Sequence, residues 1–178
     1  VTTPSAPVSG ACTGGISSFP YSESFESGLG AWSQGSGDDN NWTRDSGGTP
    51  SSGTGPSTGS AGSWYMFLET SGSGTGFPSK TAYLNSPCFN LSSASDATFS
   101  FDYHMNGTSM GSLILQVSTN NGSSWSNAWS ISGSQGNAWK SVDVDFGAYA
   151  GGAVQTRFLA TSGSSWSYDI AVDNISVT

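Results

Sequence analysis

The stretch "ATFSFDYHM", residues 97–105, alternates between apolar and polar side chains. Successive side chains of a β-strand point to opposite faces of the sheet, so this period of two predicts a strand with one buried face. The side chains expected in the core are Phe99, Phe101, Tyr103 and Met105. The opposite face carries Ser100, Asp102 and His104. We interpret His104 as a packed or surface structural residue, because a lone histidine is a weak metal signal.

Similar patterns recur along the chain. "WYMFLET", residues 64–70, is a nearly continuous apolar run, and alternating segments occupy residues 112–119, 139–146, 154–161 and 168–177. Turn-forming Gly, Asn and Ser residues separate these segments, and none of them shows a convincing helical stripe. The pattern predicts an all-β domain of about eight to ten strands and favours a β-sandwich.

The chain has 178 residues, enough for a single domain with a sizeable core. It contains 25 Gly, yet 12% of its residues are aromatic, which opposes disorder. Residues 1–18 are rich in Pro, Ser and Gly and are predicted to form a linker or an N-terminal arm, with the folded domain over 19–178. The Gly/Ser-rich segments 45–63 and 71–79 are predicted to be surface loops.

The net charge of −8 is carried with only four Lys and Arg residues. So few cations form no basic patch, which makes nucleic acid and anionic membranes poor partners. No run of residues approaches the ~20 apolar residues that a membrane helix needs. Because the chain begins Val-Thr-Thr-Pro, we expect it to be a processed piece that is tethered to other domains of a longer protein.

Two cysteines are present, Cys12 and Cys88. Low charge, many Ser, Gly and Thr residues and an even number of cysteines are typical of secreted, extracellular proteins, where the two thiols would pair. Two buried free thiols are the alternative. The composition favours the disulfide and a secreted location.

Several ordered blocks resemble one family. They are "SFESGLGAW" (24–32), "DDNNWTR" (38–44), "GPSTG" (55–59) before "WYMFLET" (64–70), "AYLNSP" (82–87), "FSFDYHMNG" (99–107) and "DIAVDNISV" (169–177). Each block alone is a weak signal, but the ordered set covers roughly residues 20–178 and is similar to the MAM domain. MAM domains are extracellular modules found in meprins, neuropilins and receptor tyrosine phosphatases.

The resemblance implies a jelly-roll β-sandwich of two antiparallel sheets and no catalysis. It also implies a role in adhesion, in oligomerisation or as an accessory module of a larger secreted or surface protein. MAM domains usually carry four cysteines, and the first two would fall near Glu23 and Gly30 in this chain. The chain therefore resembles a divergent, bacterial-like member, in which a bridge between Cys12 and Cys88 would differ from the family's own bridges.

A calcium site is the first interpretation of the acidic residues. Ca²⁺ takes six to eight oxygen ligands, and acids beside a Gly/Asn-rich loop leave backbone carbonyls free to join them. Some members of the resembled family hold a cation between the first strand, the Asp-Asp loop and the final strand. The corresponding residues in this chain are Glu26, Asp38 or Asp39, and Asp173. Glu69, at the end of an apolar strand, is a candidate further ligand.

Two alternatives remain for these acids. A glycoside hydrolase or lyase would use two of them as an acid and base pair, but no paired-carboxylate strand motif is present. A serine hydrolase would need a histidine and a nucleophile elbow, and the single His104 has none near it. In the last alternative the acids are solvated or cap turns, and Asp39 pairs with Arg44.

Tryptophans supply the candidate ligand surface. The seven Trp include Trp32, Trp42 and Trp64, which are expected to pack in the core. The tryptophans next to Gly/Ser/Asn loops are Trp125, Trp129 and Trp166. Together they would form a flat platform for a sugar, unless they only shield a hairpin or an end of the sandwich.

The sequence thus predicts a non-catalytic, secreted, calcium-stabilised interaction module that binds an extracellular protein or a glycan. A carbohydrate-binding module of a polysaccharide-degrading enzyme is the alternative. A small glycoside hydrolase or lyase domain is the third interpretation.

Overall fold

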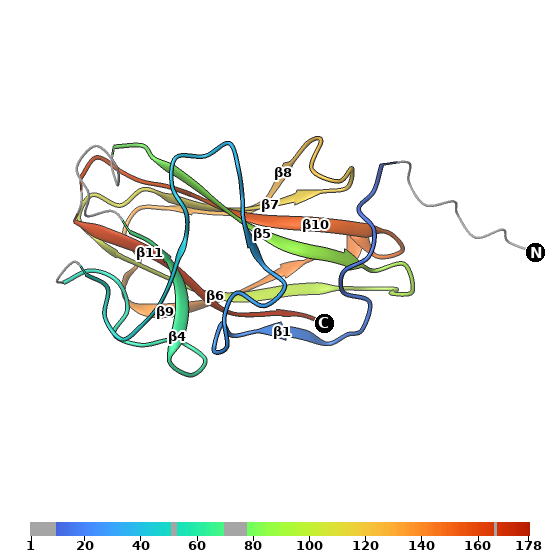
Figure 1. Cartoon of the computed structure of the whole chain (residues 1–178), viewed down its shortest axis with the longest axis horizontal. Helices are drawn as coiled ribbons and strands as arrows, with labels where there is room; N and C mark the ends of the chain where they lie inside the picture. The colour runs from blue at the N-terminus through green and yellow to red at the C-terminus, as the bar shows by residue number, and fades with distance from the viewer. Residues whose placement is uncertain (1–9, 51–52, 70–77, 166) are drawn as a thin grey trace, which may run out of the picture.

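In the part of the chain that the structure describes, eleven strands form two antiparallel sheets that stack face to face (Figure 1). The computed structural model describes residues 10–50, 53–69, 78–165 and 167–178. The six-stranded sheet has the order β3 (Thr43–Ser46), β4 (Trp64–Leu68), β11 (Tyr168–Val177), β6 (Thr98–Gly107) and β9 (Gly136–Asp145), and β1 (Tyr21–Glu23) also pairs with β11. The five-stranded sheet has the order β2 (Ser33–Gln34), β5 (Thr81–Asn90), β10 (Ala153–Thr161), β7 (Ser112–Ser118) and β8 (Ser126–Ser132). The predicted jelly-roll β-sandwich of two antiparallel sheets is confirmed.

Every segment that the alternation predicted is a strand, but five strands lie outside those segments. The strands that the alternation did not predict are β1, β2, β3, β5 and β8. Of these, β5 is ten residues long and contains Pro87 together with several polar residues, a composition that hides strand character. One short 3₁₀ helix, Gly147–Tyr149, follows β9. Within the described ranges, no helix is long and apolar enough to cross a membrane.

The apolar face of β6 lies in the core, as the alternation in residues 97–105 predicts. Phe99, Phe101 and Met105 are at most 1% exposed. The ring of Phe158, from β10 of the other sheet, lies 5.0 Å from that of Phe101 and 5.7 Å from that of Trp32. These rings bridge the two sheets, so the core is built mainly from large aromatic side chains, each of which buries a large apolar area.

On the polar face of β6, Asp102 and His104 are not open to solvent. A loop over residues 47–63, here called the covering loop, lies across this face, and its residues 51–52 are outside the described part of the chain. The segment was predicted to be a surface loop, but its Gly55, Pro56 and Gly59 are buried. A Cβ on Gly59 would come within 2.7 Å of the Trp64 carbonyl oxygen, so only glycine lets the backbone approach this closely.

A disulfide joins Cys12 to Cys88, with Cα atoms 5.8 Å apart, so the predicted bridge is confirmed. Close to it, Ile16 pairs with Phe89 in an isolated parallel bridge. The backbone N–H of Ile16 donates to the Cys88 carbonyl, and that of Asn90 donates to the Ile16 carbonyl, both at 2.8 Å. The described part of the predicted N-terminal arm, residues 10–18, is therefore attached to the end of β5.

Removal of the disulfide should destabilise the domain. The bridge closes a sequence separation of 76 residues. In the chain-entropy model, a loop of this length contributes about 4 kcal/mol to the free energy of unfolding. We expect the Cys12→Ser/Cys88→Ser double variant to lose an amount of that order in guanidinium unfolding at pH 7. An unchanged midpoint would show that the arm adds no constraint to the unfolded chain.

Candidate functional site

Glu26 and Asp173, two of the predicted calcium ligands, lie close together and hold the end of the covering loop. Glu26 Oε1 accepts the backbone N–H groups of residues 63 and 64 at 2.9 and 2.7 Å. Asp173 Oδ2 accepts those of residues 60 and 61 at 2.8 and 2.9 Å. A carboxylate that accepts two neighbouring N–H groups fixes the backbone of the turn that carries them.

Two further buried acids, which the sequence did not single out as site residues, hold the same loop. Asp169 is fully buried, and its Oδ2 accepts the hydroxyls of Thr49 at 2.6 Å and Thr54 at 2.8 Å. Asp102 Oδ2 accepts the hydroxyl of Ser60 and, at 3.0 Å, the side-chain amide of Asn174. In the sequence, the only signal for these two acids is that they alternate with core residues. Such alternation gives the face of the strand on which an acid lies, but it does not show what covers that face.

Burial raises the pKa of Asp173 to about 6, because its carboxylate is desolvated. The N–H groups that it accepts oppose the shift, whereas the nearby negative charge of Glu26 adds to it. The two carboxylates are therefore close enough to repel each other. A cation between them would relieve that repulsion.

Asp38 and Asp39 do not join this pair. Their oxygens accept hydrogen bonds at the start of β5, in the five-stranded sheet. Asp38 Oδ2 accepts the Tyr83 N–H at 2.7 Å, and Asp39 Oδ2 accepts the Thr81 N–H at 3.0 Å. These bonds attach the Asp-Asp loop to the edge of that sheet, and the hydrogen bonds to Thr81 lower the pKa of Asp39.

The expected pair between Asp39 and Arg44 is wrong. Arg44 Nε donates to the Phe25 carbonyl at 2.6 Å, and its Nη2 donates to the Glu26 carbonyl at 2.7 Å. The guanidinium also lies 3.7 Å from the centroid of the Trp64 ring. Arg44 therefore holds the backbone that leads into Glu26 instead of neutralising the Asp-Asp loop.

The five predicted ligands thus do not fit one calcium site. Glu26 and Asp173 come together, Asp38 and Asp39 lie at β5, and Glu69 is half-buried directly after β4. Among the residues that the structure describes, no three His, Cys, Asp or Glu side chains are grouped so that they could hold a metal ion. The hydrogen-bonded oxygens of Glu26 and Asp173 accept backbone N–H groups.

His104 is a packed structural residue, in line with its interpretation from the sequence. It is 2% exposed, and burial lowers the pKa of its imidazole. Its Nε2 lies 3.0 Å from Asn137 Oδ1, and its ring packs edge-on against Trp139 with centroids 5.6 Å apart. Trp139 in turn donates its Nε1–H to the Thr58 carbonyl of the covering loop at 3.0 Å.

A hollow of ≈ 290 Å³ lies between the covering loop and Asn137. Its other lining residues are Gly48, Thr49, Gly53, Thr54, Gly55, Pro56 and Ser57. Among the lining residues that the structure describes, none has a charged side chain and none is aromatic, so they supply neither the groups that a catalytic site uses nor a platform on which a sugar stacks.

Two of the three candidate platform tryptophans, Trp125 and Trp129, do not lie together. Trp129 packs against the core, with its ring 5.0 Å from that of Phe101 and 5.2 Å from that of Tyr103. This position takes Trp129 out of the expected platform. Trp166 lies outside the described residues. Trp32 and Trp42 are buried as predicted, at 3% and 2% exposure.

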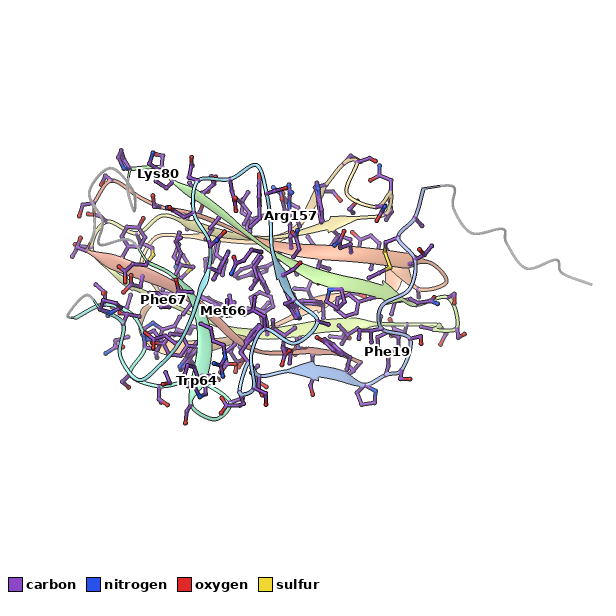
Figure 2. All side chains as sticks on the ribbon, viewed as in Figure 1. Phe19, Trp64, Met66, Phe67, Lys80 and Arg157 are labelled. Carbon is purple, nitrogen blue, oxygen red and sulfur yellow. A yellow bond between two sulfur atoms is a disulfide. The ribbon has the colours of Figure 1, made fainter. Side chains whose placement is uncertain are left out.

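Trp125 lies on the outer face of the five-stranded sheet, beside Arg157. The Arg157 guanidinium carbon is 4.1 Å from the centroid of the Trp125 ring and 3.9 Å from that of Tyr83. The guanidinium is therefore held between two rings. Figure 2 shows Arg157 in the layer opposite Trp64 and Phe67. Burial lowers the pKa of Arg157, and the charge of Asp38 opposes that shift. The stack keeps a cationic, planar donor group in one orientation.

Comparison with known proteins matches the sequence of this chain to one family. The sequence model of the MAM domain, meprin/A5/mu, matches residues 24–178. The MAM domain-containing glycosylphosphatidylinositol anchor protein 1 of Rattus norvegicus is 38% identical over 151 residues, which are 79% of this chain and 15% of the relative. Neuropilin-1a of Danio rerio is 36% identical over 104 residues, which are 56% of this chain and 11% of that protein. The chain thus spans only a small part of these relatives.

Solved structures share the sandwich at low sequence identity. The K1 cleaved adhesin domain of Lys-gingipain from Porphyromonas gingivalis W83 aligns with a TM-score of 0.65 at 19% identity, covering 90% of this chain and 98% of that one. TmCBM61 in complex with β-1,4-galactotriose aligns with a TM-score of 0.58 at 18% identity, covering 87% and 93%. At such low sequence identity, the structural similarity establishes a shared fold and nothing more.

Asp173 should make the stability of the protein depend on pH. Its folded pKa of about 6 lies above its ordinary value of 3.8, so its contribution to stability is complete below pH 4 and is lost as the pH rises through 6. In EDTA, we expect the protein to gain about 1.4 kcal/mol relative to Asp173→Asn when the pH falls from 7.5 to 5.

The comparison with Asp173→Asn matters because His104 acts in the opposite direction. The buried imidazole has a lowered pKa, so protonation of the unfolded chain below its ordinary value of 6.5 costs stability. Urea unfolding of both proteins at several pH values isolates the Asp173 contribution. Parallel curves over this range would contradict the raised pKa.

Proposed function

Because the chain belongs to the MAM domain family, we propose that it is a non-catalytic binding module of a larger extracellular protein. Its relatives include proteins named as glycosylphosphatidylinositol anchor proteins, and the Cys12–Cys88 disulfide suits an oxidising compartment. A module of this size that is joined to other domains would position its parent protein at a surface or on a ligand.

The observation that supports this proposal best is the difference between the two outer sheet faces. In β11 and the central part of β6, nearly every residue is buried on both faces, because the covering loop lies on the outer one. In β5, β7 and β10, buried and half-buried residues alternate, so one face is reachable from solvent. Antiparallel sheets commonly have one face packed on the core and one face open to solvent, and an open face is available to a ligand. We assign ligand binding to the outer face of the five-stranded sheet.

The arrangement of the acids supports a non-catalytic role. Asp102, Asp169, Asp173 and Glu26 accept hydrogen bonds that hold the covering loop. A hydrolase instead needs an acid and a base that face a bound substrate. His104 is buried beneath the same loop and serves no accessible site.

Carbohydrate binding is the second candidate function, and the Arg157 stack favours it over protein binding. Rings combined with planar hydrogen-bonding groups on a sheet face suit sugars, which offer both apolar faces and hydroxyls. Solved sandwiches of similar fold include a module in complex with β-1,4-galactotriose and a xylan-binding domain. In this form of the proposal the chain is a carbohydrate-binding module.

A charge placed on the ligand face should weaken binding. Leu159 lies half-buried on the outer face of β10, and Ala138 is exposed on β9 of the other sheet. The wild type is screened on an array of extracellular protein domains and polysaccharides, including xylan and galactan. We expect Leu159→Arg to weaken the binding found there by at least about tenfold, or 1.4 kcal/mol, and Ala138→Arg to leave it unchanged.

Two results would contradict this proposal. Loss of binding in Ala138→Arg but not in Leu159→Arg would place the ligand on the other sheet. Release of new reducing ends from any polysaccharide, abolished by a single Glu or Asp substitution, would show catalysis. Melting temperatures of both variants separate loss of binding from loss of folding.

Calcium stabilisation is a further part of the proposal, now restricted to Glu26 and Asp173. Two carboxylates are few for Ca²⁺, so we expect a dissociation constant of about 1 mM, as in weak extracellular sites. At 10 mM calcium such a site would stabilise the protein by about 1.4 kcal/mol, which is a rise in Tm of a few degrees. Asp173→Asn should lose this rise, and Asp39→Asn should keep it. If Tm is the same in EDTA and in 10 mM calcium, the proposal of a structural calcium ion is wrong.

A further inference from the structure

Planar polar side chains form a row across the five-stranded sheet. Arg157 on β10 is the cross-strand partner of Asn85 on β5 and of Gln116 on β7. Gln116 is in turn the partner of Asn127 on β8. We call these four residues the amide–guanidinium row. The row crosses four neighbouring strands, a span of about 15 Å, which suits a chain of several sugar units better than a single small molecule.

Hydrogen bonds within the row fix its side chains. Arg157 Nε donates to Gln116 Oε1 at 2.7 Å, and Gln116 Nε2 donates to Asn127 Oδ1 at 3.0 Å. The rings of Tyr83 and Trp125 hold the two faces of the guanidinium. A guanidinium has further N–H donors on its two terminal nitrogens, and these lie in the same plane. The row therefore presents oriented donors and acceptors whose conformational freedom is already reduced, which lowers the entropic cost of binding.

One acceptor of the row has no partner. Asn85 Oδ1 is buried and accepts no hydrogen bond in the described structure. An unsatisfied buried oxygen costs free energy, and a native structure usually retains one only where another molecule satisfies it. Asn85 lies directly across from Arg157, so a ligand group that reached its amide could also accept from the guanidinium. A sugar hydroxyl can do both, since it donates one hydrogen bond and accepts others.

The charge around the row favours an uncharged ligand. Asp38 lies near enough to Arg157 to affect its pKa, so the positive charge of the guanidinium is partly balanced. The whole chain carries a net charge of −8, which repels polyanions at long range. The residues next to the row, Ile114 and Leu159, are half-buried and apolar, and suit the C–H faces of sugar rings.

We propose that the amide–guanidinium row, with Tyr83 and Trp125, is the binding site for a neutral oligosaccharide. This inference rests on the carbohydrate-binding form of the proposed function and adds the ligand class and the residues. The planar groups bind hydroxyls through directional hydrogen bonds, and the ring edges and apolar neighbours contact the C–H groups. The preference for a neutral chain follows from the charge around the row, and the choice among neutral chains follows from the geometry of the donors.

Calorimetric titration tests the proposal with the folded chain. The probes are four neutral hexasaccharides, namely the β-1,4-linked gluco-, xylo-, manno- and galacto-oligomers, and the hexamer of galacturonic acid. We expect at least one neutral probe to bind more tightly than about 1 mM, the weak end of protein affinities, and the acidic hexamer to bind at least about tenfold more weakly.

Variants locate the site. Arg157→Lys keeps the charge but loses the planar fork, and should weaken binding by at least about tenfold. Gln116→Ala removes a half-buried surface amide, leaves the core untouched, and should weaken binding as well. Lys140→Ala, at an exposed cation on β9 of the other sheet, is the matched control and should leave the affinity unchanged. Melting temperatures confirm that each variant is folded.

Several results would overturn this inference. They are the absence of binding to every neutral probe, tighter binding of the acidic hexamer, and equal affinities of Gln116→Ala and the wild type. If the chain then binds an extracellular protein in a manner that Leu159→Arg abolishes, the proposed function stands and only the glycan site fails. If a probe is cleaved, the non-catalytic function fails with it.

Discussion

Carboxylates buried in the six-stranded sheet accept the N–H and O–H donors of the covering loop, and the rest of the arrangement depends on this interaction. A loop rich in Gly, Ser and Thr has few apolar side chains with which to pack, so its backbone and hydroxyl groups must supply the binding energy. Asp102, Asp169 and Asp173 provide acceptors on the sheet, and Glu26 provides another beside it. Hydrogen bonds to a charged acceptor are stronger than neutral ones, which lets so polar a loop remain ordered against the sheet.

This use of the acids makes the two sheets unequal. The chain's own covering loop closes the outer face of the six-stranded sheet. The loop is hydrogen-bonded to Asp102 and Trp139, and Trp139 packs against His104. The other sheet keeps an outer face of half-buried side chains, among which Arg157 is held between two rings. In the proposed function, the closed face contributes stability and the accessible face contributes recognition. A family that is built on one sandwich can therefore change its ligand on one sheet without disturbing the contacts on the other.

The fold was predictable from the sequence because the core-facing residues of β6, β7, β9 and β10 alternate, and those of β11 alternate on either side of a register shift between Asp173 and Ser176. The strand β5 was not predicted, because Pro87 and its polar neighbours interrupt the pattern of apolar residues. The pairing of Glu26 with Asp173 followed from family likeness, whereas the loop-binding role of Asp102 and Asp169 did not. Alternation gives the side of a strand on which a residue lies, but the partner of that side is set by how a distant loop packs. For the same reason Trp125 and Trp129 looked alike in sequence, yet one lies on the outer face and the other packs into the core.

Both arginines bind through their planar shape. Arg44 covers the Trp64 ring and donates to two carbonyls, and Arg157 is held between Tyr83 and Trp125 and donates to an amide. In a chain with a net charge of −8, the available carboxylates would favour simple ion pairing. The carboxylates instead bind N–H and O–H groups of loops, which leaves the guanidinium groups to stack and to donate in fixed directions. Such a division favours a surface that recognises its ligand by the positions of hydroxyl groups, since directional donors discriminate between sugars where a net charge cannot.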